Sequence, residues 1–499
     1  MEMQFQKKSC RCMKTVVYET QNQELTQELK LSDALPDVGR IIGTWGQVIL
    51  RGKEWRSESV AVSGGIMGWI LYQPEDGSVP RTLDTWVPFQ MKWGLPEGTK
   101  EGNIRGKGLL RFLDARSVSP RKIMLRCGIS ALMEASEPAE QDVYIPDGLP
   151  GDVALLQNTY PVRLCISAGE KSFRVEEDLT LPQSAPIPEK LISYTLTPRV
   201  TEKMLRGGKL VFKGIGDLHL VYRSQEGQLH CWDFSLPFSQ YADLADPLGS
   251  DAGGDVTMAV TDLDLDLTPE GQLRLKAEIL GQYLVEDRVL LEVTEDAYSP
   301  RRAVQPVVEE MRLPVVLEER GETVTAEAVI PGDADVVVDT QILPEYPHLR
   351  RTDAGFRMEL NGQFQVLCYG ADGALQMRQG RWAVNREIPA HEDTLLRPCI
   401  VHMETPRCSS GDGVLEVKTE LQLNRKATGN HSVSCVTGMT LGELQEPDPM
   451  RPSVILRRAG NQRLWDIAKS CGSTVEEIRG INRLEGEPVP ERMLLIPVV

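Results

Sequence analysis

A segment of about 150 residues recurs along the chain, and this repeat limits the possible folds more than any other feature of the sequence. Gly64–Tyr72 and Gly214–Tyr222 have the same length, begin with glycine, end in tyrosine and are each followed by a Pro-Phe pair. A weaker third copy, Gly362–Tyr369, is one residue shorter. Because similarity at a fixed offset is the mark of duplicated structural units, we expect three units with one strand order. The glycines should mark bulges or close backbone approaches.

The repeated units have the pattern of β-strands. In residues 262–267 aspartates alternate with leucines, which places the leucines on one face of a strand. Residues 268–271 have turn chemistry, and the alternation resumes in residues 273–279. Arg274 and Lys276 should then lie opposite the aspartates and pair with them across the strands. Such strands, with few helical patterns between them, predict a mainly β protein of packed antiparallel sheets.

Composition and charge exclude several classes of protein. The chain is 41% apolar and 25% charged, which is enough to bury several cores. Its net charge of −17 argues against binding to nucleic acid or to an anionic membrane. No apolar run is long enough to span a bilayer, and residues 1–20 lack the apolar core of a signal peptide. The ten scattered cysteines fit reduced thiols in a cytosolic protein.

The C-terminal 48 or so residues have a different pattern. Residues 454–456 indicate a short strand, and residues 464–468 form the apolar face of a helix. Ser473 and Glu476 have the spacing of a capping box at the start of a second helix. Residues 493–496 indicate a closing strand. We therefore expect a small βααβ domain.

No pattern in the sequence indicates catalysis, a metal or a cofactor. Residues 102–108 are glycine-rich and basic, but their spacing is not that of a phosphate-binding loop, so we interpret them as a basic turn. Cys10 and Cys12 are expected to be a surface thiol pair at a frayed terminus. The six histidines have no metal-ligand spacing, and no nucleophile motif is present. We predict no catalytic residue, no metal ligand and no cofactor, and we expect that the protein is not an enzyme.

Trp465 is the most informative aromatic residue, and two roles are open for it. It could form a large part of the core of a very small domain, or it could contact a partner through its edge. The loops at the strand–helix and helix–strand junctions of the same domain are held by a small rigid scaffold and are candidates for partner contact. The predicted binding residues are Asn461, Gln462, Arg463, Leu464, Trp465, Asn482, Arg483 and Leu484.

The C-terminal segment resembles a LysM domain. The residues that carry this resemblance occur in the order of the family: Gly460, Leu464–Ala468, Thr474–Ile478, Asn482 and Leu494–Pro497. The loop before the tryptophan is one residue longer than in most family members, where it helps to form an N-acetylglucosamine groove.

The β repeats resemble the SPOCS domain, through the Gly-to-Tyr strand pair followed by a Pro-Phe segment. Repeated SPOCS-like segments before a terminal LysM domain resemble the SipL family of spore coat morphogenetic proteins. The resemblance implies three SPOCS-like antiparallel, sandwich-like segments followed by a small βααβ LysM domain. The predicted parts are residues 1–168, 169–318, 319–445, a linker at 446–452 and the LysM domain at 453–499.

The resemblance to this family also implies a function. It predicts a non-enzymatic scaffold whose LysM domain docks onto a SpoIVA-like coat ATPase and whose β domains recruit other coat proteins. The implied location is the cytoplasm of the mother cell, at the forespore surface. The alternative, drawn from the LysM resemblance alone, is a protein that binds peptidoglycan in the cortex or cell wall.

Overall fold

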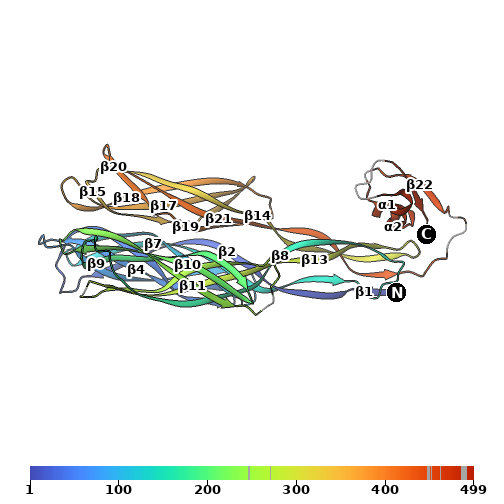
Figure 1. Ribbon diagram of the computed structural model, residues 1–499, viewed down its shortest axis with the longest axis horizontal. Coiled ribbons are helices and arrows are strands. Elements are labelled where there is room, and N and C mark those ends of the chain that lie inside the picture. Colours follow the sequence, from blue (N-terminus) through green and yellow to red (C-terminus); the bar gives the residue numbers. More distant parts are fainter. Residues whose placement is uncertain are drawn as a thin grey trace.

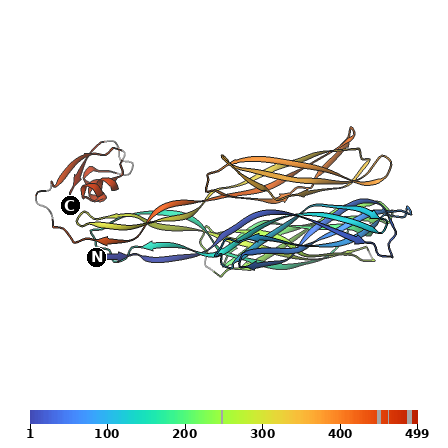
Figure 2. The same ribbon diagram turned by 180° about the vertical axis from the view of Figure 1, so that it is seen from behind.

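The computed structural model describes residues 1–245, 248–269, 271–446, 450, 452–460, 462–484 and 492–498. It is a mainly β protein in which every described strand pairing is antiparallel. Long strands form an elongated body, and a small C-terminal domain lies at one end (Figures 1 and 2). Within the described ranges, no helix has the length and apolarity needed to cross a membrane.

Three units of the body share one order of strand pairing. In each unit the second, third and fourth strands form one sheet, while the sixth strand pairs with the first and the fifth. Unit 1 consists of β2 (Gln6–Lys30), β3 (Val38–Arg56), β4 (Ser59–Pro74), β5 (Arg81–Gly94), β6 (Asn103–Ser119) and β7 (Lys122–Ile145). Unit 2 consists of β8 (Ala154–Leu179), β9 (Pro188–Arg206), β10 (Lys209–Ser224), β11 (Leu229–Asp243), β12 (Gly253–Leu267) and β13 (Leu273–Tyr298).

Unit 3 repeats this order with two strands interrupted. Its second position is divided into β15 and β16, and its fifth into β19 and β20. The unit consists of β14 (Val304–Pro331), β15 (Val336–Pro344), β16 (His348–Thr352), β17 (Gly355–Tyr369), β18 (Leu375–Pro389), β19 (Leu395–Met403), β20 (Arg407–Gly411) and β21 (Val414–Leu441).

A glycine occupies the same place in the third strand of each unit. At each of these glycines a neighbouring strand comes close to the backbone, as expected from the repeat. A Cβ atom would lie 2.0 Å from a backbone oxygen of the neighbouring strand at Gly64, 2.3 Å at Gly214 and 2.6 Å at Gly362. In units 1 and 2 the neighbouring strand has a bulge at this level, at Arg51 and Thr201. In unit 3 the strand ends here instead. Only glycine leaves room for this approach.

Each unit packs two sheets around an apolar core. One sheet of unit 1 and one of unit 2 join through β2 and β8 into a single six-stranded sheet. The three sandwiches also share a smaller apolar contact, to which unit 1 contributes Trp45 and Trp69, unit 2 contributes Ile192 and unit 3 contributes Leu367. The repeat therefore produces three cores that are joined side by side along the body.

The first and last strands of each unit run on beyond the sandwiches as two-stranded ribbons. The three ribbons meet around an apolar cluster and form what we call the stalk; this cluster includes Val143, Val162, Leu291, Leu313 and Val433. At its tip the short strand β1 (Glu2–Gln4) pairs with β21 (Figure 1). Cys10 and Cys12 lie in β2, half-buried in the stalk, so the expectation of a frayed terminus was wrong.

The long first strands also place the unit connections away from the predicted boundaries. The connections lie at residues 146–153 and 299–303, whereas the predicted boundaries after residues 168 and 318 fall inside β8 and β14. The offset between repeated segments predicts the length of a unit, but it does not predict the residue at which each unit begins.

The alternation near residues 262–279 forms the expected hairpin. Asp264 lies opposite Lys276, and Asp266 lies opposite Arg274, in β12 and β13. Arg274 nevertheless donates its Nε to Asp178 of β8, at 3.2 Å. The polar face is therefore a three-strand charge network.

The C-terminal domain, called the tail here, consists of β22 (Val454–Arg458), α1 (Leu464–Cys471), α2 (Val475–Asn482) and β23 (Met493–Pro497). Thr474 caps α2, because its hydroxyl accepts a 3.2 Å hydrogen bond from the backbone N–H of Glu477. The capping box expected at Ser473 was thus placed one residue too early; Ser473 is buried. Within the predicted linker, residues 447–449 and 451 lie outside the described residues.

Candidate functional site

Trp465 lies in the contact between the tail and the tip of the stalk. Its side chain is 7% exposed, and its indole Nε1 donates a 2.8 Å hydrogen bond to Asp296 of β13. Its ring also packs edge-on against Tyr298, with 4.6 Å between the ring centroids. The residue therefore contributes to the core of the tail, and its edge contacts another part of the same chain.

Lys469 completes this tail–stalk contact. It lies one helical turn after Trp465, on the same face of α1, and its Nζ is 2.8 Å from both carboxylate oxygens of Asp296. Burial raises the pKa of Asp296, but the hydrogen bonds from Lys469 and Trp465 outweigh burial and leave the pKa below its ordinary value. Tyr298 adds a 2.9 Å hydrogen bond to the carbonyl of Ser473.

Three other predicted binding residues support the tail from within. Leu464 is fully buried, and Leu484 packs partly buried against the same core. The side-chain amide of Asn482 donates to the carbonyls of Ile478, at 2.8 Å, and of Leu495, at 2.5 Å. Its side-chain oxygen accepts from the N–H of Leu495, so Asn482 joins α2 to β23.

The remaining predicted binding residues lie on the surface of the tail. Arg463 is exposed and pairs with Asp466 at 3.2 Å, and Gln462 accepts a 2.8 Å hydrogen bond from Arg457. Arg483 is exposed and ends α2 in the left-handed conformation, with φ of 51°. Asn461 lies outside the described residues. Gln462, Arg463 and Arg483 are called the tail rim here.

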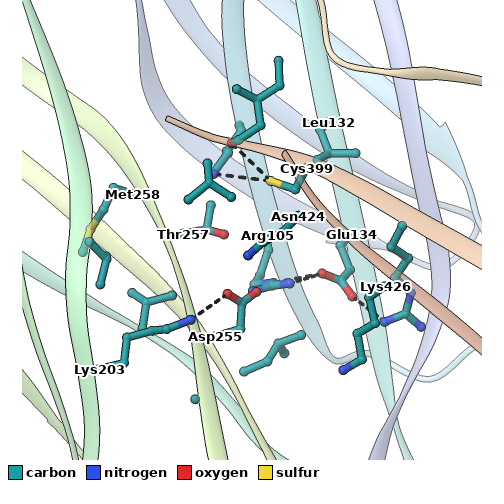
Figure 3. A pocket seen from close by; sticks show the side chains of 18 of the residues that line it. Arg105, Leu132, Glu134, Lys203, Asp255, Thr257, Met258, Cys399, Asn424 and Lys426 are labelled. Carbon is teal, nitrogen blue, oxygen red and sulfur yellow. Dashed lines mark hydrogen bonds and ion pairs between the residues drawn. The ribbon is translucent and has the colours of Figure 1, made fainter. Parts of the chain in front are cut away.

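A cavity of about 300 Å³ lies where the three units meet, and no pattern in the sequence predicted it (Figure 3). The residues interpreted as a basic turn lead into it. From Asn103 onward they form β6, and Arg105 and Lys107 both line this junction cavity. The interpretation as a turn was wrong because Gly106 and Gly108 serve close packing: a Cβ would lie 3.0 Å and 2.7 Å from valine side chains.

Charged side chains from all three units form a chain across the cavity. Arg105 donates to Glu134 within unit 1, and its second branch lies 2.9 Å from Asp255 of unit 2. Arg397 of unit 3 is 3.4 Å from Glu134, and Lys203 of unit 2 is 3.5 Å from Asp255. Positive and negative groups therefore alternate, and both ends of the chain are positive. Figure 3 shows the part of this chain from Lys203 through Asp255 and Arg105 to Glu134.

Glu134 is the most deeply buried member of this chain, with 4% of its side chain exposed. Burial raises its pKa, but the charges of Arg105 and Arg397 outweigh burial and hold the pKa below its ordinary value. The carboxylate therefore stays ionised and joins units 1 and 3. No local spacing could reveal this, because Arg105, Glu134 and Arg397 lie far apart in sequence.

A second polar contact joins the three units at His219. Its Nδ1 lies 2.6 Å from Asp233 of the same unit, and its Nε2 lies 3.1 Å from Asp339 of unit 3. Trp45 of unit 1 donates its Nε1 to Asp339 at 3.4 Å. Burial lowers the pKa of His219, but the two aspartates outweigh burial and raise the pKa to about 10.

Comparison with known proteins identifies one part of the chain. Residues 188–268 match the family model described as SipL, SPOCS domain. The matched segment runs from the first residue of β9 to one residue beyond β12, and so covers the four inner strands of unit 2. The search of curated proteins and the search of solved structures each gave no match. The match supports a SipL-like, sporulation-related family for this segment.

Proposed function

We propose that the protein is a non-enzymatic scaffold of the spore coat. In this proposal the tail docks onto a SpoIVA-like coat ATPase, and the β units recruit other coat proteins at the forespore surface, in the cytoplasm of the mother cell. The observation that carries the proposal is the match of residues 188–268 to the SipL, SPOCS domain model.

The strand pairing of the body supports an extension of this match to the whole β region. Units 1 and 3 have the pairing order of unit 2, and all three have the glycine at the same place. We therefore assign SPOCS-like domains to all three units. Three related surfaces side by side suit a scaffold that holds several partners.

The element order of the tail, β22-α1-α2-β23, supports its assignment as a LysM domain. The tail–stalk contact occupies the edge of Trp465, which leaves the tail rim for a partner. Arg463 and Arg483 give the rim two guanidinium groups, and arginine is enriched at interface hot spots because it can bind carboxylates in a two-pronged manner. Arg463 holds Asp466 of the tail in this way, so a partner's carboxylate must compete with Asp466 there. A neutral sugar groove gains little from such charge.

The test is a double substitution of Arg463 and Arg483 to alanine in the full chain. Binding to a purified SpoIVA-like ATPase should weaken by more than about 2 kcal/mol, the size expected of a hot spot. Arg320→Ala, which removes an exposed arginine of β14, should bind like the unmodified chain. Equal binding of all three proteins would contradict docking through the rim.

The same titration separates the proposal from the peptidoglycan alternative. N-acetylglucosamine oligomers should show no binding at millimolar concentration. Micromolar binding of these oligomers, together with no binding of the ATPase, would favour a wall-binding LysM protein instead.

A further inference from the structure

We propose that the junction cavity binds a phosphate-type oxyanion, either free or as part of a small molecule. Eight lysine and arginine residues line the cavity, against four aspartate and glutamate residues, in a chain whose net charge is −17. Carboxylates just outside the lining pair with two of these residues, Asp217 with Arg199 and Glu318 with Arg425, but the lining itself is mostly basic. It lies in a cleft between the units, where charge interactions are stronger than at an open surface.

Two arginines of the lining each have one buried hydrogen-bond donor with no acceptor among the described residues. Arg425 is 9% exposed; its terminal nitrogens pair with Glu318 and Glu322, but its buried Nε has no acceptor within the described ranges. The Nε of Arg397 is buried and also lacks an acceptor in the part of the chain that the structure describes. Buried donors in native proteins are normally satisfied, so these two need an acceptor, which an oxygen of an anion or of a water can supply.

Lys107 supplies the third positive group. It lies two residues after Arg105 in β6, but it does not join the alternating chain of charges. The contact recorded for its Nζ within the described residues is the thiol of Cys399, at 3.9 Å. A thiol is a weak acceptor. The charge of Lys107 helps to lower the pKa of Asp255, but among the described residues no carboxylate accepts a hydrogen bond from its Nζ, and such an ammonium group attracts an anion.

The arrangement of charges also places the anion within the cavity. Asp255 keeps 60% of its side chain accessible and repels anions from the unit 2 side. Lys107, Arg397 and Arg425 come from β6, β19 and β21, on the side of units 1 and 3. Asn424 and Thr257, which are labelled in Figure 3, add uncharged polar groups to the lining. Donors that converge from several strands suit the oxygens of a tetrahedral anion.

A cavity of about 300 Å³ admits a phosphate group with its bound water, or a small phosphate ester. Because its ligands would come from units 1 and 3, a bound oxyanion should hold these units together. Binding should therefore raise the melting temperature of the body, since a ligand of the folded state alone stabilises that state.

The experiment measures thermal unfolding of the full chain with inorganic phosphate or glycerol phosphate, against sodium chloride at equal ionic strength. We expect a saturable rise in melting temperature with at least one of the phosphates. Lys107→Met should weaken the apparent affinity by about tenfold or more, as expected for loss of a charge-assisted hydrogen bond. Lys92→Met, at an exposed position of β5, is the matched control and should bind like the unmodified chain.

The two phosphates separate the possible sources of the ligand. A response to inorganic phosphate alone assigns the cavity to the free ion, and a stronger response to the ester assigns it to a phosphorylated small molecule. No response beyond that of chloride would overturn the proposal, as would equal binding by the Lys107→Met variant with its fold retained in circular dichroism.

Discussion

The body and the tail are stabilised in different ways. The body distributes its stability over three sandwich cores, a shared apolar contact and long strands that run from the units into the stalk. The tail has one core of a few side chains, and Trp465 serves both this core and the contact with the stalk. Large strand systems tolerate the loss of one contact, whereas in a small domain a single side chain decides whether the domain folds.

The largest effect should come from Trp465→Ala. Removal of a buried tryptophan costs roughly 3–5 kcal/mol, which is enough to unfold a domain of this size. Differential scanning calorimetry of the full chain should show loss of the tail's transition and an unchanged transition of the body. Trp86→Ala, which removes a 40% exposed tryptophan of the body, is the matched control. A folded tail in the Trp465 variant would show that the tail, like the body, does not depend on a single side chain.

The second effect concerns the body and depends on pH. The pKa of His219 is raised to about 10 in the folded state, so its stabilisation is complete below the ordinary histidine pKa of about 6.5 and is lost as pH rises toward 10. Between pH 7 and pH 9 this amounts to about 2–3 kcal/mol. Chemical denaturation at both pH values measures it. His219→Gln should reduce the fall in stability by this amount and leave the part due to buried thiols, such as Cys165 and Cys231, whose pKa burial raises to about 12. An unchanged pH dependence in that variant would exclude the histidine as a cause.

Gly64→Ala should have a somewhat smaller effect, of about 1–3 kcal/mol, because the new Cβ would lie 2.0 Å from a backbone oxygen and the strands must move apart. The melting temperature of the body reports this cost. A Cβ at Gly94 meets no atom within 4 Å, so Gly94→Ala should be close to neutral. Similar melting temperatures of the two variants would show that the close approach at the repeated glycine is not needed.

The smallest effect should come from Asp296→Asn, which keeps an acceptor for Trp465 but loses the charge that attracts Lys469. The pair is partly exposed, so we expect about 1 kcal/mol or less. Hydrogen exchange should show faster opening of α1, with Glu292→Gln on the same ribbon as the control. Because the pKa of Asp296 is lowered, the contact should persist above pH 4 or so and weaken as pH falls below it. Unchanged exchange in α1 would show that the charge does not hold the tail.

The sequence predicts the mainly β class of the fold because strand alternation and turn chemistry are local. The hairpin at Asp264 and Asp266 shows this, since its register follows from the alternation together with the turn at residues 268–271. The boundaries after residues 168 and 318 failed for the opposite reason. They depend on how far β8 and β14 extend into the stalk, which is decided by packing between ribbons that are distant in sequence.

The candidate sites also differ in whether local sequence or long-range packing forms them. The tail residues were recognised because the segment from Gly460 to Pro497 has a local order of elements. That order does not tell which of these residues point inward. It could not show that Leu464 and Asn482 support the tail from within while Arg463 and Arg483 lie on its surface. The junction cavity brings Arg105, Glu134 and Arg397 together across two units, so only the packed chain reveals it.

The position of β21 has a mechanical consequence. The chain leaves the body at the end of this strand, and β21 is paired with β14 along almost its whole length and with β1 at the tip. A force that pulls the tail away along the stalk axis loads these ladders in shear, so that many hydrogen bonds bear it at once. A force across the axis would open the ladders one pair at a time. The molecule is therefore most resistant to rupture along its own length.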